Sequence, residues 1–206
     1  MSDANLAMAG HSGELLESSP FGIPSKKLAI WLFIIADGMT FAAVLIAYGF
    51  LRNASTHWPY PFHDPVNVTV MTFILISSSM TMLMGVLESR AGRRKQAVMW
   101  MWLTAVGGAI FAGFHIREWL RLIAEGMTPY KNPWGDPVFG ASFYGVTGLH
   151  LLHVVGGVLV MIGVTLAYNK GTFTADHVET TALYWHFVDL VWMFVVPFIY
   201  LLNFSR

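Results

Sequence analysis

Five long apolar runs, separated by short polar connections, make up most of the chain. Each run is about as long as the roughly 20 apolar residues that a helix needs to cross the hydrocarbon core of a bilayer. Inside lipid the backbone groups must hydrogen-bond within their own segment, so the runs predict helices. The sequence therefore predicts an all-α integral membrane protein, a bundle of five transmembrane helices, with spans at Leu28–Leu51, Val66–Leu87, Ala97–His115 extending toward Ala124, Ala141–Tyr168 and Ala182–Asn203.

The segment ahead of the first run has a different character. Residues 1–25 are polar, small and weakly acidic, without the basic stretch and apolar run of a secretory signal peptide. We find no internal repeat and no composition shift that would mark a second folded unit. We therefore expect a polar cytoplasmic tail over residues 1–25 and one five-helix transmembrane domain over residues 26–206.

The distribution of lysine and arginine predicts the orientation in the membrane. Four basic residues lie between positions 90 and 95, in one very short connection, where the preference of positive charge for the cytoplasm is strongest. We therefore expect a cytoplasmic amino terminus and an outer carboxyl terminus. The expected cytoplasmic set is Lys26, Lys27, Arg90, Arg93, Arg94, Lys95 and Lys170, and the expected outer set is Arg52, Arg117, Arg121, Lys131 and Arg206.

Composition narrows the classes of function. Charged residues make up 12% of the chain, about half of what soluble domains carry, and hydrophobic residues make up 55%. The formal net charge is zero, so nucleic acid is not an expected partner. The absence of cysteine excludes structural disulfides and thiolate metal sites, so only histidine and carboxylate side chains remain as strong metal ligands.

Asp37 is the most unusual residue of the first predicted span. At about 1.5 Å per residue from Leu28, it lies roughly 13 Å into the membrane from the cytoplasmic side. An ionisable group at that depth is costly and normally faces protein, water or a partner. One interpretation is a group that exchanges protons or tunes a nearby proton path. The interpretation we favour from spacing alone is a protonated carboxyl bonded to a neighbouring helix, with candidate partners Ser77, Ser78, Ser79 and Thr81.

Three histidines in the last two predicted spans allow two interpretations. His150 and His153 are three residues apart and share a helix face. Together with His186 they would supply a three-imidazole metal site, or two of them would clasp a haem, as in an enzyme or an electron carrier. The interpretation we favour is hydrogen bonding between helices that approach closely at small residues, here Gly145, Gly148, Gly156 and Gly157.

Carboxylates near the ends of the spans complete the set of polar candidates. Glu118 and Arg121 are three residues apart near the outer end of the third span, which predicts an ion pair on one helix face. In the last span, Glu179, His186 and Asp189 lie on nearly the same face. Because buried charges must repay a large desolvation cost, we expect this polar seam to face the bundle or a partner subunit.

Two segments carry a resemblance to a known family. Thr147–Gly148–x–His150–x–x–His153–Val154–x–x–Gly157 and Tyr184–Trp185–His186–Phe187–Val188–Asp189–x–Val191–Trp192 resemble the signature segments of subunit III of cytochrome c and quinol oxidases. The resemblance spans about residues 29–203. Glu179, seven residues before His186, matches a glutamate of that family, and Glu118 resembles another. Asp37 stands where the family has a carbodiimide-reactive glutamate. The chain resembles the five-span bacterial form, which lacks the first two spans of longer members.

The resemblance implies a non-catalytic core subunit of a proton-pumping haem–copper terminal oxidase, multi-pass in the bacterial inner (plasma) membrane. Such a subunit binds no haem or copper itself; it packs against subunit I, which carries these cofactors, and is expected to contact subunit II, phospholipid and other respiratory complexes. It supports proton uptake during the reduction of O2 to water. Asp37 would then lie in a lipid-facing or subunit-facing cleft near the proton entry. No catalytic residue or metal ligand is implied, and the expected structural polar contacts are Glu118, His150, His153, Glu179, His186 and Asp189.

Two alternatives remain open from the sequence. The first is an accessory subunit of a nitric oxide reductase, whose accessory protein shares this family pattern. The second is a free-standing membrane haem or metal protein that uses His150, His153 and His186. A Soret band or stoichiometric bound metal in the isolated chain would favour the second alternative over a subunit without a redox centre of its own.

Overall fold

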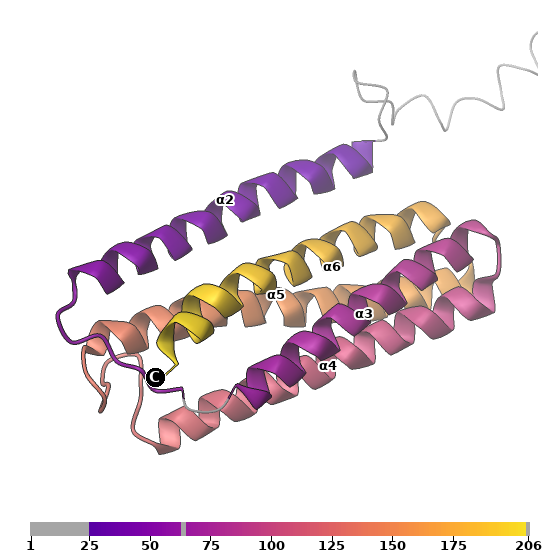
Figure 1. The fold of residues 1–206 in the computed structure, drawn as a ribbon. Coiled ribbons are helices and arrows are strands. Elements are labelled where there is room, and N and C mark those ends of the chain that lie inside the picture. The colour runs from indigo at the N-terminus through magenta and orange to yellow at the C-terminus, as the bar shows by residue number, and fades with distance from the viewer. Residues whose placement is uncertain (1–24, 63–64, 205–206) are drawn as a thin grey trace, which may run out of the picture.

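The computed structural model describes residues 25–62 and 65–204, and the described chain folds into five long helices without a strand (Figure 1). All five are long and apolar enough to cross a membrane. The predicted all-α bundle of five spans is therefore confirmed, whereas the predicted tail over residues 1–25 lies, apart from Ser25, outside the described residues. The helices are α2 (Ser25–Ala54), α3 (Val66–Arg90), α4 (Arg94–Ala124), α5 (Pro137–Lys170) and α6 (Ala175–Val195).

Four of the helices form a bundle, and the fifth lies against its side. Helices α3 and α4 pack as a hairpin, α5 packs on α4, and α6 packs on both α5 and α3 (Figure 1). Helix α2 packs on α6 and α5, and of its thirty residues it buries only Phe41 and Tyr48. Most of its apolar surface therefore faces lipid or another protein.

The two ends of the bundle differ in charge. The start of α2, the α3–α4 turn and the α5–α6 turn lie together, since Lys27 and Arg90 both contact Glu179 at the start of α6. We call this end, with Arg93 and Arg94 in the α3–α4 turn, the basic end. The opposite end holds the carboxyl terminus of α2 and the last turns of the chain, and we call it the outer end.

Helices α5 and α6 begin a full turn or more before the positions that hydropathy predicts. Helix α5 begins at Pro137 and not at Ala141, because the Asp136 side chain accepts a hydrogen bond of 3.0 Å from the Val138 backbone N–H and proline suits the first helical position. That backbone hydrogen bond holds the pKa of the Asp136 carboxyl below its usual range. Helix α6 begins at Ala175 and not at Ala182, behind a capping box of Thr174 and His177.

The last predicted span is continuous but not regular. Helix α6 passes into a π-helical turn, Val196–Tyr200, and then into a 3-10 turn, Leu201–Asn203. Pro197 lacks a backbone N–H, so the α-helical hydrogen-bond pattern cannot continue through it unchanged. After these turns the Asn203 side chain is fully buried at the outer end.

Two tryptophans of α6 occupy the centre of the bundle. Trp185 and Trp192 are fully buried, and their indole N–H groups donate to hydroxyls of α3, Ser78 at 3.1 Å and Thr72 at 3.0 Å. These bonds satisfy the polar end of each ring in an apolar interior. The space for Trp185 comes from Gly108 on α4, where an added Cβ would lie 2.4 Å from the indole ring.

The glycines predicted to allow close approach of helices divide into two kinds. At Gly157 an added Cβ would lie 3.1 Å from the Trp185 ring, and at Gly148 it would lie 3.2 Å from the Trp119 ring. At Gly145 and Gly156 an added Cβ would meet nothing within 4 Å. Gly148 and Gly157 therefore make room for aromatic side chains of neighbouring helices, whereas Gly145 and Gly156 meet no neighbouring helix.

Candidate functional site

The intramembrane carboxylate of α2 faces a histidine of α5. Asp37 Oδ2 lies 3.2 Å from His153 Nε2, and both side chains are largely buried, with about an eighth of their surface exposed, 13% and 14% respectively. The contact has the distance of an ion pair without the alignment of a hydrogen bond. It joins a peripheral helix to the bundle at membrane depth.

The predicted partners of Asp37 on α3 are wrong. Helix α2 packs on α5 and α6, so the hydroxyls of α3 are turned to other groups. Ser78 accepts from Trp185, Ser79 bonds to His186, and Thr81 bonds to Thr104 of α4. Hydropathy cannot reveal which spans are neighbours, so the sequence alone could not place His153 beside Asp37.

The surroundings of His153 determine where its ring protons lie. His153 Nδ1 is 2.7 Å from the backbone oxygen of Leu149, and because a carbonyl can only accept, Nδ1 must carry a proton. The opposite nitrogen, Nε2, faces Asp37. The Tyr184 hydroxyl donates to the His153 backbone oxygen at 3.1 Å, and the Phe41 ring covers the imidazole edge-on at 5.2 Å.

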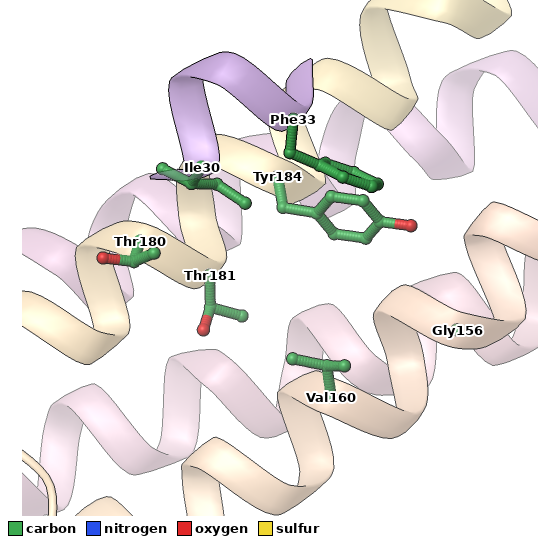
Figure 2. Close-up of a pocket in the computed structure, with 7 residues that line it drawn as sticks. All are labelled: Ile30, Phe33, Gly156, Val160, Thr180, Thr181 and Tyr184. Atoms are coloured by element: carbon green, nitrogen blue, oxygen red, sulfur yellow. The ribbon is translucent and has the colours of Figure 1, made fainter. Parts of the chain in front are cut away.

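A hollow of about 390 Å³ opens beside this pair toward the basic end (Figure 2). The rings of Phe33 and Tyr184, 5.9 Å apart, form one wall. The hydroxyls of Thr180 and Thr181 donate to carbonyls of their own helix at 2.8 and 2.9 Å, so they offer little polarity to an occupant. The hollow is thus an apolar space between α2, α5 and α6, lined by Ile30, Phe33, Gly156, Val160, Thr180, Thr181 and Tyr184.

A second hollow, of about 230 Å³, lies between α2 and α6 farther toward the outer end. Gly38 and Phe41 of α2 line it together with apolar residues of α6 that include Leu190 and Phe194. Phe33, one turn before Asp37, lines the first hollow. The Asp37–His153 contact therefore lies between two loosely filled stretches of the α2 interface.

The imidazoles of His115 and His150 are buried in the core of the bundle. His150 and His115 are fully buried and pack on the same indole, with ring centroids 5.0 and 5.7 Å from that of Trp192. Within the part of the chain that the structure describes, none of their four ring nitrogens has a hydrogen-bond partner. The sequence analysis did not include His115 among the candidate site residues. His115 lies three residues before Glu118 on one face of α4, and that spacing was the signal in the sequence that could have identified it.

The three histidines of the metal alternative lie in separate environments. His150 stacks on Trp192, His153 faces Asp37, and His186 Nδ1 bonds to Ser79 Oγ at 3.0 Å. Ser79 also lies beside the Asp189 carboxylate. Over residues 25–62 and 65–204, no three histidine or carboxylate side chains gather as a metal site would require. The three imidazoles of this alternative therefore do not lie together.

The two remaining carboxylates join helices near the ends of the bundle. Glu118 accepts a hydrogen bond of 2.7 Å from Asn67 of α3, while Arg121, its predicted partner, donates to Glu125 at 2.9 Å. Glu179 lies at the basic end, where it contacts Lys27 of α2 at 3.1 Å and Arg90 of α3 at 2.7 Å. Glu179 thus ties three helices together, away from the membrane depth of His186.

Comparison with known proteins identifies the family. The sequence model of the family "Cytochrome c oxidase subunit III" matches residues 21–204. The chain belongs to the cytochrome c oxidase subunit III family. It is 30% identical over 185 residues to cytochrome c oxidase subunit 3 of Alkalihalophilus pseudofirmus, a match that covers 87% of each chain.

Relatives named for quinol oxidases are as similar. The chain is 34% identical to the cytochrome bo(3) ubiquinol oxidase subunit 3 of Pseudomonas aeruginosa, over 84% of this chain and 83% of that one. It is 31% identical to the quinol oxidase subunit 3 of Bacillus spizizenii, over 85% and 86%. The predicted resemblance is confirmed. This subunit III is a multi-pass protein of the bacterial plasma membrane with an accessory role in a haem–copper oxidase, and these relatives do not support the nitric oxide reductase alternative.

Proposed function

We propose that this subunit III packs against subunit I and subunit II of a proton-pumping terminal oxidase, and that these partners carry the haems and the copper. Membership of the subunit III family supports this assignment. Purification through a tag on this chain is expected to yield a complex with haem absorption, whereas the chain separated from that complex has none. A Soret band that stays with the separated chain would contradict the proposal.

The face of α3 and α6 around His186 is the proposed contact with a partner subunit. Ser79, His186 and Asp189 are only partly buried, although they lie in the middle of membrane-spanning helices. Polar side chains at this depth avoid lipid and face protein or water. A partner helix that covers the three side chains would shield them from hydrocarbon, which is the observation that carries this part of the proposal.

The basic end faces the cytoplasm in the proposed orientation. Lys27 and Arg90 lie there with the short α3–α4 turn that contains Arg93 and Arg94. Short loops rich in lysine and arginine favour the cytoplasmic side. In this orientation the hollow beside Asp37 lies in the cytoplasmic half of the membrane.

The hollow between α2, α5 and α6 holds a phospholipid acyl chain in this proposal. Its lining is apolar, and it opens between a peripheral helix and the bundle. A space of about 390 Å³ lies within the usual range of ligand pockets, roughly 300–1,000 Å³. An alkyl chain would bury apolar surface there without leaving a polar group unpaired.

A variant that fills the hollow tests the lipid site. Gly156→Leu places a side chain in the hollow, because an added Cβ at Gly156 meets nothing within 4 Å. The purified complex is expected to lose about one tightly held phospholipid per subunit III. Gly163→Leu is the matched control, since Gly163 is equally open on the same helix but does not line the hollow. Equal lipid content in both variants and the unaltered complex would exclude this site.

Asp37 supports proton uptake by the oxidase in this proposal. It is a carboxylate at membrane depth beside a titratable imidazole and two hollows that water or lipid can enter. Asp37→Asn is expected to leave the complex assembled and to lower sustained turnover and proton pumping at alkaline pH. Unchanged activity over many turnovers at that pH would remove Asp37 from any role in proton uptake.

A further inference from the structure

At the interface between α2 and the bundle, Asp37 Oδ2 faces His153 Nε2, and the hydrogen bonds of the imidazole determine which of these atoms carries a proton. His153 Nδ1 holds one proton, which it donates to the Leu149 carbonyl. In a neutral imidazole the other nitrogen, Nε2, is then a bare acceptor. That acceptor faces Asp37 Oδ2 at 3.2 Å, and an ionised carboxylate also only accepts. Two lone pairs at this distance repel, so the observed contact requires an additional proton.

We infer that Asp37 and His153 form a binding site for one exchangeable proton, which fastens the middle of α2 to α5. The proton rests on the carboxyl or on the imidazole, and in either case the pair as a whole has no net charge. The bound species is the proton itself, and no metal or anion is needed.

The groups around the pair leave no other source of charge balance. From α6 the pair is faced by Tyr184, whose hydroxyl proton is already donated to the His153 backbone oxygen. From α5 it is faced by His150, which lies one turn away and stacks on Trp192. Among the described residues no lysine or arginine forms an ion pair with Asp37. A negative charge there without a proton would remain uncompensated in a low-dielectric layer.

Helix α2 is otherwise held mainly at its two ends. At the outer end Arg52 and Tyr48 bond to the last turns of the chain, and at the basic end Lys27 contacts Glu179. Between these points lie the two hollows and the Asp37–His153 contact, with Phe41 packed beside it. Loss of the proton converts an attraction into a repulsion at this central contact. We therefore expect the part of α2 between Lys27 and Asp37 to loosen.

The test follows backbone hydrogen exchange of α2 in the intact purified complex between about pH 5 and about pH 10. After correction for the chemical pH dependence, exchange over residues 28–37 is expected to rise about tenfold at high pH, while residues 44–54 stay unchanged. Infrared difference spectra over the same range are expected to show loss of one proton from a carboxyl or imidazolium group. In Asp37→Asn both changes should be absent, because the amide donates a permanent N–H to Nε2.

Two further variants separate the proton from general effects on α2. Asp37→Glu restores a carboxyl and should regain both pH-dependent signals. Thr40→Val removes a polar group one turn away whose hydroxyl donates to the Ala36 carbonyl of its own helix, and it should behave like the unaltered complex. The inference is overturned if exchange over residues 28–37 is independent of pH, or if Asp37→Asn keeps the same pH dependence. Phospholipid content is measured separately with Gly156→Leu, so either proposal can fail alone.

Discussion

The Tyr48 hydroxyl accepts a hydrogen bond of 2.5 Å from the Asn203 side-chain amide, which joins the first described span to the end of the last one. The Asn203 oxygen in turn accepts from the Trp58 indole N–H at 2.9 Å. Asn203 and Tyr48 are almost completely buried. Tyr48 and Asn203 are 155 positions apart in the sequence, and their hydrogen bond helps to hold α2 to the last turns of the chain at the outer end, together with the bond from Arg52 to the Leu202 carbonyl.

Asn203→Leu is expected to detach the outer end of α2. The change leaves the Tyr48 hydroxyl and the Trp58 N–H without their partner, and a buried unpaired polar group costs about 1–3 kcal/mol. Faster hydrogen exchange over residues 44–54 and a lower unfolding temperature of the complex would be observed. Asn53→Leu, at an exposed asparagine of the same end, serves as the control and should change neither. Equal protection of residues 44–54 in both variants would contradict the anchoring role.

His186→Leu is expected to weaken association with the catalytic subunit. The substitution removes the partner of Ser79 and leaves Asp189 without its neighbouring imidazole on a face that crosses the membrane. The fraction of purified complex that retains this chain after a detergent wash measures the effect. Leu190→Ala, on the same helix but exposed, is the control. A His186→Leu complex that stays fully assembled and equally heat-stable would argue against a partner at this face.

The cap of α5 predicts a dependence of stability on pH. The pKa of the Asp136 carboxyl is lower in the folded chain than its ordinary value, mainly because of the Val138 backbone N–H. Because this pKa is lowered by folding, the ionised cap stabilises the fold at pH values above about 4, where the carboxyl of the unfolded chain is also ionised. This stabilisation is lost as the pH falls through the pKa that the Asp136 carboxyl has in the folded chain.

Two substitutions at position 136 separate charge from capping. Asp136→Ala removes the cap and should cost about 1 kcal/mol near neutral pH, with a smaller difference in acid. Asp136→Asn keeps a capping oxygen without a titrating group, so its unfolding temperature relative to Asp136→Ala should not vary with pH. The unfolding temperatures of the three complexes between about pH 3 and about pH 7 measure these differences. A constant difference between the unaltered chain and Asp136→Ala across that range would be inconsistent with the lowered pKa.

The spans could be predicted because lipid imposes one strong requirement on each of them. An apolar run of sufficient length identifies a helix without knowledge of its neighbours, and the five predicted runs match α2 to α6. The starts of α5 and α6 were missed because Asp136 and Thr174 act through capping, in segments too polar for hydropathy to include.

The pairing of polar side chains could not be predicted in the same way. The position of Asp37 at membrane depth followed from counting residues, but its partner depends on which helix packs beside α2. That helix is α5, far away in the sequence, so His153 and not a serine of α3 meets Asp37. The same limit applies to Glu118, because its electrostatic interaction with Arg121 on its own helix could be predicted, whereas its hydrogen bond from Asn67 on α3 could not.

Gly108→Ala is expected to disturb the centre of the bundle. The added methyl would lie 2.4 Å from the ring of Trp185, which is fully buried, and 2.7 Å from a methyl of Val158. Overpacking of this kind typically costs about 1–3 kcal/mol, which outweighs the helix propensity gained on replacing glycine by alanine, about 1 kcal/mol or less. Gly113→Ala is the matched control on the same helix, since an added Cβ there meets nothing within 4 Å. The unfolding temperature of the complex should fall for Gly108→Ala and stay level or rise for Gly113→Ala. A fall of the same size in both variants would show that the contact with Trp185 is not the cause.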